Sequence, residues 1–258
     1  MRLTGHRSPR DEAQELMWNA MDCVYRDSDR AASLCRDAIC LYGDCTDAHA
    51  MLAQLESETV QDYIDGLRSA VEAGRRDLGP VCFEEDAGVF WGLIETRPFM
   101  RAMGMLADAF RELGTVAAID EAINIYEEML ALNPNDNQGV REPLAGCYLV
   151  RRRYDAVSRL FEKYPDDWLA TPAWIRVLHA FATGDTARAA SLLVEARKRN
   201  AHVEAYLTGT KRRPRHRSGS YSPGDESEAV YCADTVWAAW KRHPKACSWL
   251  REACQPCP

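Results

Sequence analysis

The segment from Glu95 to Arg141 constrains the fold most, because apolar residues recur in it twice at helical spacing. The first stripe contains Met103, Leu106, Ala107 and Phe110, which fall on one side of a helix. The second stripe follows Gly114 and consists of Ile119, Ala122, Ile123, Tyr126, Met129, Leu130 and Leu132. Two such helices cannot bury their apolar faces alone, so the segment predicts a stack of antiparallel helix pairs.

Capping residues set the expected ends of these two helices. Thr96 is the expected N-cap of the first helix, with Pro98 tolerated in the first turn, and Gly114 is the expected C-cap. Asn133-Pro134 ends the second helix, because proline disfavours helical geometry at the residue before it.

This unit resembles a tetratricopeptide repeat. Ala122, Tyr126 and Leu130 stand twelve, eight and four residues before Pro134, as in the second helix of that repeat. The unit departs from the repeat in the longer turn after Gly114, and in Met103, where tryptophan is usual. The resemblance implies helix pairs that stack on one another.

Other parts of the chain have the same patterning. Helix pairs are expected at 11–26 with 29–42, 47–55 with 62–74, 137–150 with 154–161, and 173–183 with 186–199. We therefore predict an all-α fold, an α-solenoid of tetratricopeptide-like antiparallel helix pairs with a helical C-terminal cap. The predicted divisions are a disordered N-terminus (1–10), the repeat domain (11–209) with an irregular insertion (about 75–95), a basic flexible loop (210–224), capping helices (225–250) and a tail (251–258).

Composition narrows the class of protein. The chain has 258 residues, of which 28% are charged, and this fraction is ordinary for a globular protein. Its formal net charge of −7 argues against general affinity for nucleic acid. Its start contains no apolar signal segment, and we expect a cytoplasmic protein without membrane contact. The ten cysteines are expected to be reduced thiols.

A narrower resemblance rests on the segments GVFWGLIETRPFMRA, LNPNDNQGVR, YPDD and NAHVEAYLTG, together with EAVYCADTVWAAW and SWL. They are similar to a bacterial group of tetratricopeptide proteins related to the suppressor-of-tumorigenicity-7 family. The resemblance implies no catalytic activity and no cofactor.

These patterns favour a non-enzymatic scaffold that binds a peptide or helix of a partner protein in a concave groove lined by first helices. The groove is expected near Met103–Phe110, Tyr148 and Trp174–Phe181. The predicted peptide-binding residues are Arg97, Arg101, Asn137, Arg141 and Tyr148. Gly104 and Asp108 stand where a carboxylate clamp would need lysine or asparagine, so an acidic-tail partner is disfavoured.

Each of these residues also has a structural interpretation. Arg97 and Arg101 form an i, i+4 pair of like charges, which needs an anion such as Glu95 or the run Glu84–Asp86. The polar cluster from Asn133 to Arg141 is typical of a turn and an N-cap.

Three further hypotheses compete with peptide binding. Residues 197–217 carry a net charge of +7, which allows an alternative function as a nucleic-acid adaptor. The residues that would bind are Lys211, Arg212, Arg213, Arg215 and Arg217. An enzyme with a site near Glu95 and Arg97 is the second. A small zinc site is the third, although a loose tail is the preferred interpretation of its residues: His243, Cys247, Cys254 and Cys257.

Overall fold

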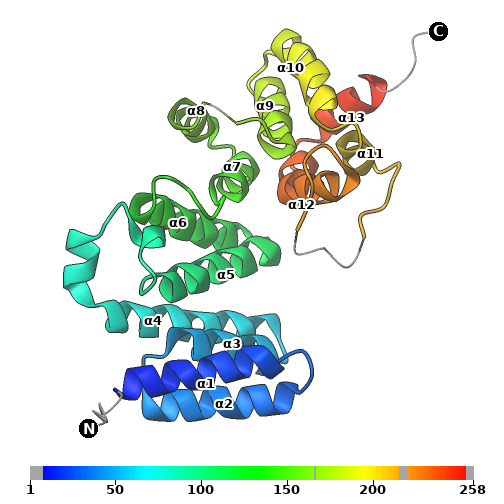
Figure 1. The fold of residues 1–258 in the computed structure, drawn as a ribbon. Helices are drawn as coiled ribbons and strands as arrows, with labels where there is room; N and C mark the ends of the chain where they lie inside the picture. Colours follow the sequence, from blue (N-terminus) through cyan, green and yellow to red (C-terminus); the bar gives the residue numbers. More distant parts are fainter. Residues whose placement is uncertain (1–7, 166, 215–219, 254–258) are drawn as a thin grey trace. The chain divides into compact units, whose positions relative to one another are not determined.

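The computed structural model describes residues 8–165, 167–214 and 220–253. Within these ranges the regular elements are thirteen α-helices and one short 3₁₀ helix (Figure 1), which confirms the predicted all-α fold class. The chain divides into two compact units, residues 1–140 and 141–258, and we describe each by itself.

Unit 1 consists of three consecutive helix pairs. In each pair a short turn brings the second helix back against the first, and α3 and α5 also pack on the preceding helices. The helices are α1 (Pro9–Cys23), α2 (Ser28–Leu41), α3 (Thr46–Glu56), α4 (Val60–Glu85), α5 (Arg97–Leu113) and α6 (Val116–Leu132).

Local capping fixes several of these helix ends. Ser8 and Asp11 form a reciprocal capping box at the start of α1, and Thr59 forms one with Asp62 at the start of α4. The chain is therefore helical from Pro9, two residues earlier than the sequence predicts. Gly114 ends α5 in the left-handed conformation (φ 68°), as expected for a C-cap glycine.

The irregular insertion is shorter than predicted. Helix α4 continues to Glu85, with a break at Gly79, whose φ of 67° and ψ of 166° are not helical. A 3₁₀ helix covers Phe90–Gly92 before α5 begins. Thr96 is the N-cap residue of α5, as predicted, but its hydroxyl does not bond to the first turn of the helix. The hydroxyl donates to the backbone carbonyls of Phe90 and Leu93 instead.

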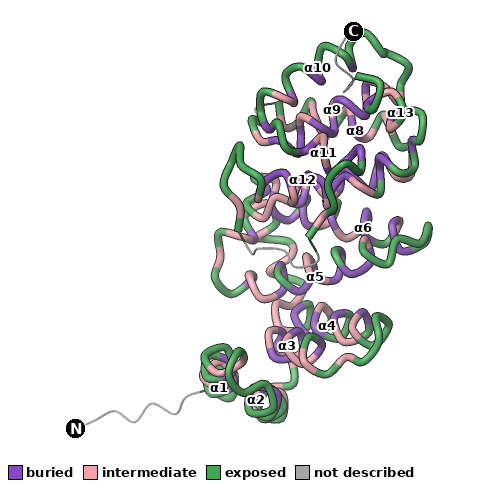
Figure 2. The backbone as a smooth tube through the Cα atoms, turned by 90° about the vertical axis from the view of Figure 1, so that its right-hand side faces the viewer, coloured by how far each residue is buried: buried purple, intermediate pink, exposed green. Residues whose placement is uncertain are grey.

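The insertion is held in place by aromatic packing. The rings of Phe83, Phe90 and Phe99 lie with centroids 5.2 to 6.4 Å apart, and the Arg75 guanidinium lies 5.1 Å from the Phe83 ring. Phe90 is fully buried. Figure 2 colours the buried residues of the described chain purple along the backbone. This packing joins the 3₁₀ segment to α4 and α5.

Unit 2 contains the remaining helices, and α12 is at its centre. Helix α12 packs against α7, α9, α11 and α13, so the expected C-terminal helical cap also supplies core residues. Its Trp240 is fully buried beside Trp174 of α9, with ring centroids 6.2 Å apart. The helices are α7 (Arg141–Val150), α8 (Tyr154–Lys163), α9 (Ala170–Ala182), α10 (Thr186–Arg199), α11 (Val203–Thr208), α12 (Glu226–Lys241) and α13 (Pro244–Ala253).

A buried carboxylate joins several segments of unit 2. Glu228 of α12 accepts hydrogen bonds from the backbone N–H of Ala170 (3.0 Å), the backbone N–H of Gly224 (2.7 Å) and the side-chain amide of Asn200 (3.0 Å). Such a group is stable only because its oxygens are hydrogen-bonded. Glu228 therefore fixes the start of α9 and the end of α10 against α12.

A helix that crosses a membrane must be both long and predominantly apolar. In the part of the chain that the structure describes, none of the helices is both long enough and apolar enough to cross a bilayer.

Candidate functional site

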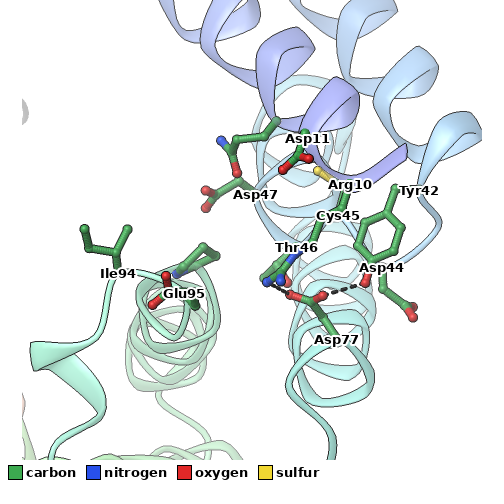
Figure 3. Close-up of a pocket in the computed structure, with 12 residues that line it drawn as sticks. Arg10, Asp11, Tyr42, Asp44, Cys45, Thr46, Asp47, Asp77, Ile94 and Glu95 are labelled. Atoms are coloured by element: carbon green, nitrogen blue, oxygen red, sulfur yellow. Dashed lines mark hydrogen bonds and ion pairs between the residues drawn. The ribbon is translucent and has the colours of Figure 1, made fainter. Parts of the chain in front are cut away.

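A cavity of about 310 Å³ lies in unit 1, and we call it the acidic pocket (Figure 3). Three helix starts contribute to it: Arg10, Asp11 and Gln14 belong to α1, Asp47 belongs to α3, and Glu95 lies two residues before the start of α5. Its remaining lining residues are Tyr42, Asp44, Cys45, Thr46, Asp77, Ile94 and Pro98.

The repeat architecture explains why these residues meet. Helices α1, α3 and α5 are the first helices of successive pairs, so their N-terminal ends lie at the same edge of unit 1. Carboxylates are stabilised at such ends by the helix macrodipole and by unpaired backbone N–H groups. Asp11 and Asp47 stand in the first turns of α1 and α3.

Arginines neutralise part of this charge. Arg10 donates to Asp77 (2.8 Å), and Arg101 donates to both oxygens of Asp47 (2.6 and 2.9 Å). Outside the lining, Arg76 pairs with Asp44 at 2.8 Å. Among the described lining residues there are five carboxylates and one guanidinium, so the cavity keeps a negative potential.

The neutral groups of the acidic pocket hold their protons firmly. Burial, followed by the hydrogen bond that its hydroxyl donates to Asp77 (2.5 Å), raises the pKa of Tyr42 to about 12. Burial likewise raises the pKa of the Cys45 thiol to about 11. The charge of the pocket at neutral pH is therefore set by its carboxylates and arginines.

The structure places the predicted arginines in internal contacts. Arg101 pairs with Asp47, and not with Glu95 or the run Glu84–Asp86 that the sequence suggests. Arg97 donates to the backbone carbonyl of Trp91 (3.0 Å), and its guanidinium lies 5.7 Å from the Trp91 ring. The predicted partners are wrong because the anion for Arg101 comes from a distant helix, which spacing within one segment does not reveal.

The polar turn after α6 has a mainly structural role. Asp136, with a left-handed φ of 49°, accepts a hydrogen bond from the backbone N–H of Val140 (2.7 Å). Asn137 is exposed in this turn. In unit 2, Arg141 pairs with Asp167 at 3.0 Å and lies 5.3 Å from the Tyr164 ring.

The predicted groove residues are mostly core residues. Met103, Phe110, Tyr148 and Trp174 are all buried, so their side chains do not line an open groove. The prediction was wrong because an apolar helical stripe marks the stacking face, whereas the exposed face of the first helices carries polar residues.

In the other two sets of candidates, four of the described residues have internal partners: Lys211, Arg213, His243 and Cys247. Lys211 pairs with Glu226, and Arg213 pairs with Asp234 at 2.7 Å. His243 uses both ring nitrogens, one with the carbonyl of Ala239 (2.8 Å) and the other with the Tyr154 hydroxyl (2.9 Å). The Cys247 thiol donates to the Trp240 carbonyl (3.2 Å). Arg215, Arg217, Cys254 and Cys257 lie outside the described residues, and Arg212 is exposed.

Sequence reasoning missed the acidic pocket. A usable signal exists, since an acidic residue stands at or just before the first turn of each first helix: Asp11, Asp47 and Glu95. The contributions of Tyr42 and Asp77 have no comparable local signal.

Comparisons with known proteins support the fold. No protein-family model and no curated protein matches the sequence. Among solved structures, the chain is similar to one described as YrrB, a TPR protein with an unusual peptide-binding site. The two are 15% identical with a TM-score of 0.52, over 73% of this chain and 86% of that one. The tetratricopeptide-repeat fold is therefore confirmed, and the narrower resemblance to the suppressor-of-tumorigenicity-7 group stays a prediction.

Proposed function

We propose that this chain, which has a tetratricopeptide-repeat fold, is a non-enzymatic adaptor that binds a basic peptide segment on the first helices of unit 1. The observation that carries the proposal is the acidic pocket, where the starts of α1, α3 and α5 meet. The similar solved protein is described as having a peptide-binding site, which agrees with this use of the fold.

Charge and size both favour an arginine or lysine side chain as the group that enters. The volume of about 310 Å³ is at the lower end of the range for ligand pockets, and suits one or two side chains. An incoming guanidinium can pair with carboxylates that the internal arginines leave partly open, such as the exposed Glu95. An acidic peptide meets repulsion instead.

The interior of a cell suits such an adaptor. The cysteines that the structure describes are all free thiols, as is usual in a reducing compartment. We therefore place the adaptor in the cytoplasm, with a protein or peptide as its partner and no cofactor.

A peptide selection tests the proposal. Random dodecapeptides displayed on phage are selected on the full-length protein at low salt. We expect enrichment of arginine and lysine among the selected peptides, and weaker binding at higher salt because exposed charge pairs are screened.

Charge variants then locate the site. Gln14→Lys places a cation in the acidic pocket and should weaken binding of the selected peptides about tenfold. Gln61→Lys adds the same charge on the exposed face of α4 and is the matched control. Selected peptides without basic residues, or equal binding by both variants, would contradict the proposal.

A further inference from the structure

A second cavity, of about 350 Å³, lies in unit 2, and we call it the basic pocket. It is built by three chain segments: the turn between α7 and α8, the C-terminal end of α9, and the turn from α12 into α13. The lining residues that matter here are Arg152, Tyr154, Phe181, Arg242, His243 and Lys245.

The charge of this cavity is of one sign. Among the described residues that line it there are three permanent cations, Arg152, Arg242 and Lys245, and no carboxylate. All three side chains are exposed, and Tyr154 and Phe181 supply the aromatic part of the wall. Like charges gathered around a cavity repel one another, so an anion between them relieves an existing cost.

The guanidinium of Arg242 does not cap the backbone carbonyls at the end of α12. The carbonyls at the end of α12 already accept from other donors, because the backbone N–H of Arg242 bonds to Ala238 and Ala239. The backbone N–H of His243 bonds to Trp240, and its ring Nδ1 bonds to Ala239. The guanidinium of Arg242 is therefore not needed to complete the helix end.

Arg152 has an unusual backbone for its residue type. Its φ of 57° lies in the left-handed region, which disfavours residues with a Cβ by about 1 kcal/mol and suits glycine or asparagine. An arginine at this position is a conformational cost in the turn. The conformation of the turn therefore does not explain why an arginine stands here. Its position in the lining of the basic pocket does explain it.

Two further features complete the site. The ten-residue helix α13 begins at the cavity with Pro244 and Lys245, and its N-terminal end adds positive partial charge. The Nδ1 of His243 donates to Ala239, so its Nε2 accepts from the Tyr154 hydroxyl (2.9 Å). This pair holds the α8 and α12–α13 walls in register.

We propose that the basic pocket binds a phosphate monoester. A single carboxylate would neutralise only one of the three cations. A phosphoryl group carries a charge of about −1.5 to −2 and has three acceptor oxygens, so it can pair with more of them. The organic part of the monoester packs against Phe181 and Tyr154. This site is independent of the peptide-binding proposal, since it belongs to the other unit.

Titration calorimetry of the full-length protein with phenyl phosphate, inorganic phosphate and benzoate tests this. We expect saturable binding of phenyl phosphate, weaker binding of inorganic phosphate because it lacks the ring, and little binding of benzoate. Benzoate binding as tightly as phenyl phosphate would overturn the phosphoryl assignment, and phosphate binding as tightly as its ester would overturn the role of the aromatic wall.

Variants then separate this site from general attraction of anions. Arg242→Gln/Lys245→Gln should weaken phenyl phosphate binding at least about tenfold. Arg159→Gln/Lys198→Gln removes two exposed cations elsewhere in the same unit and should leave binding unchanged. Arg152→Gly keeps the fold because glycine accepts a positive φ, and should also weaken binding. Equal losses in the control and the pocket variants, or no loss in either, would refute the site.

Discussion

The two units place opposite charges at opposite helix ends. In unit 1 the acidic pocket forms where α1, α3 and α5 begin. In unit 2, Arg152 and Arg242 of the basic pocket follow the ends of α7 and α12, whereas Lys245 stands in the first turn of α13. The macrodipole stabilises carboxylates at helix starts and cations at helix ends by a few tenths to about 1 kcal/mol each. The carboxylates of the acidic pocket, and Arg152 and Arg242 of the basic pocket, therefore stand at helix ends where the macrodipole favours their sign of charge.

The carboxylates of the two units also differ in how deeply they are buried. Glu228 of unit 2 is buried with hydrogen bonds to three segments, whereas Asp44 of unit 1 pairs with the exposed Arg76. Glu228→Ala should lower the free energy of unfolding of unit 2 by about 3 kcal/mol, because it leaves buried donors unpaired. Asp44→Ala should cost less than about 1 kcal/mol. Urea unfolding followed by hydrogen exchange in each unit compares them, and similar losses would remove this distinction.

Substitution of Arg101 shows whether this residue serves an internal ion pair or contacts the ligand. Its guanidinium forms an ion pair with Asp47, which lines the acidic pocket. Arg101 therefore competes with an incoming cation for the Asp47 carboxylate. Arg101→Ala should raise affinity for a basic peptide about two- to fivefold, while costing roughly 0.5 to 1 kcal/mol of stability. Fluorescence anisotropy with a labelled peptide from the selection measures this. A loss of affinity would instead assign Arg101 to the ligand.

Alkaline pH should weaken unit 1 through Tyr42. Its pKa is raised from 10.0 to about 12 by burial and by the hydrogen bond to Asp77, so the stabilisation is complete below pH 10 and is lost as pH rises towards 12. Tyr42→Phe should be less stable at neutral pH by about 1 kcal/mol and should lose stability less steeply above pH 10. Denaturant midpoints across this pH range compare the two proteins, and parallel curves would contradict the role of Tyr42.

The smallest effect concerns thiol reactivity beside the acidic pocket. Burial raises the pKa of Cys35 to about 12 and that of Cys45 to about 11, whereas Cys40 is exposed. Iodoacetamide at pH 8 should therefore modify Cys40 before Cys35 and Cys45, because the thiolate is the reactive form. Peptide mass spectrometry gives the order of modification, and early labelling of Cys45 would show that this part of unit 1 opens readily.

The sequence contained most of the fold and little of the site. The stripe from Ile119 to Leu132 predicts α6 closely, because helical periodicity is a local signal. Buried residues such as Met103 have the same periodicity as groove residues would have, so only the structure separates the two.

The acidic pocket depends on pairs that no local pattern connects. Arg10 and Asp77 are 67 residues apart, and Arg101 and Asp47 are 54 apart. The sequence correctly indicated that Arg101 needs an internal anion but could not name Asp47, since that choice depends on which helices stack.

The most direct test of peptide binding at the acidic pocket is titration calorimetry of one basic peptide from the selection against three forms of the full-length protein. These are the wild type, Gln14→Lys in the acidic pocket, and Gln61→Lys outside it. We expect Gln14→Lys to bind the peptide about tenfold more weakly, and Gln61→Lys to bind it like the wild type. Equal affinity in all three forms would show that the starts of α1, α3 and α5 are not where the peptide binds.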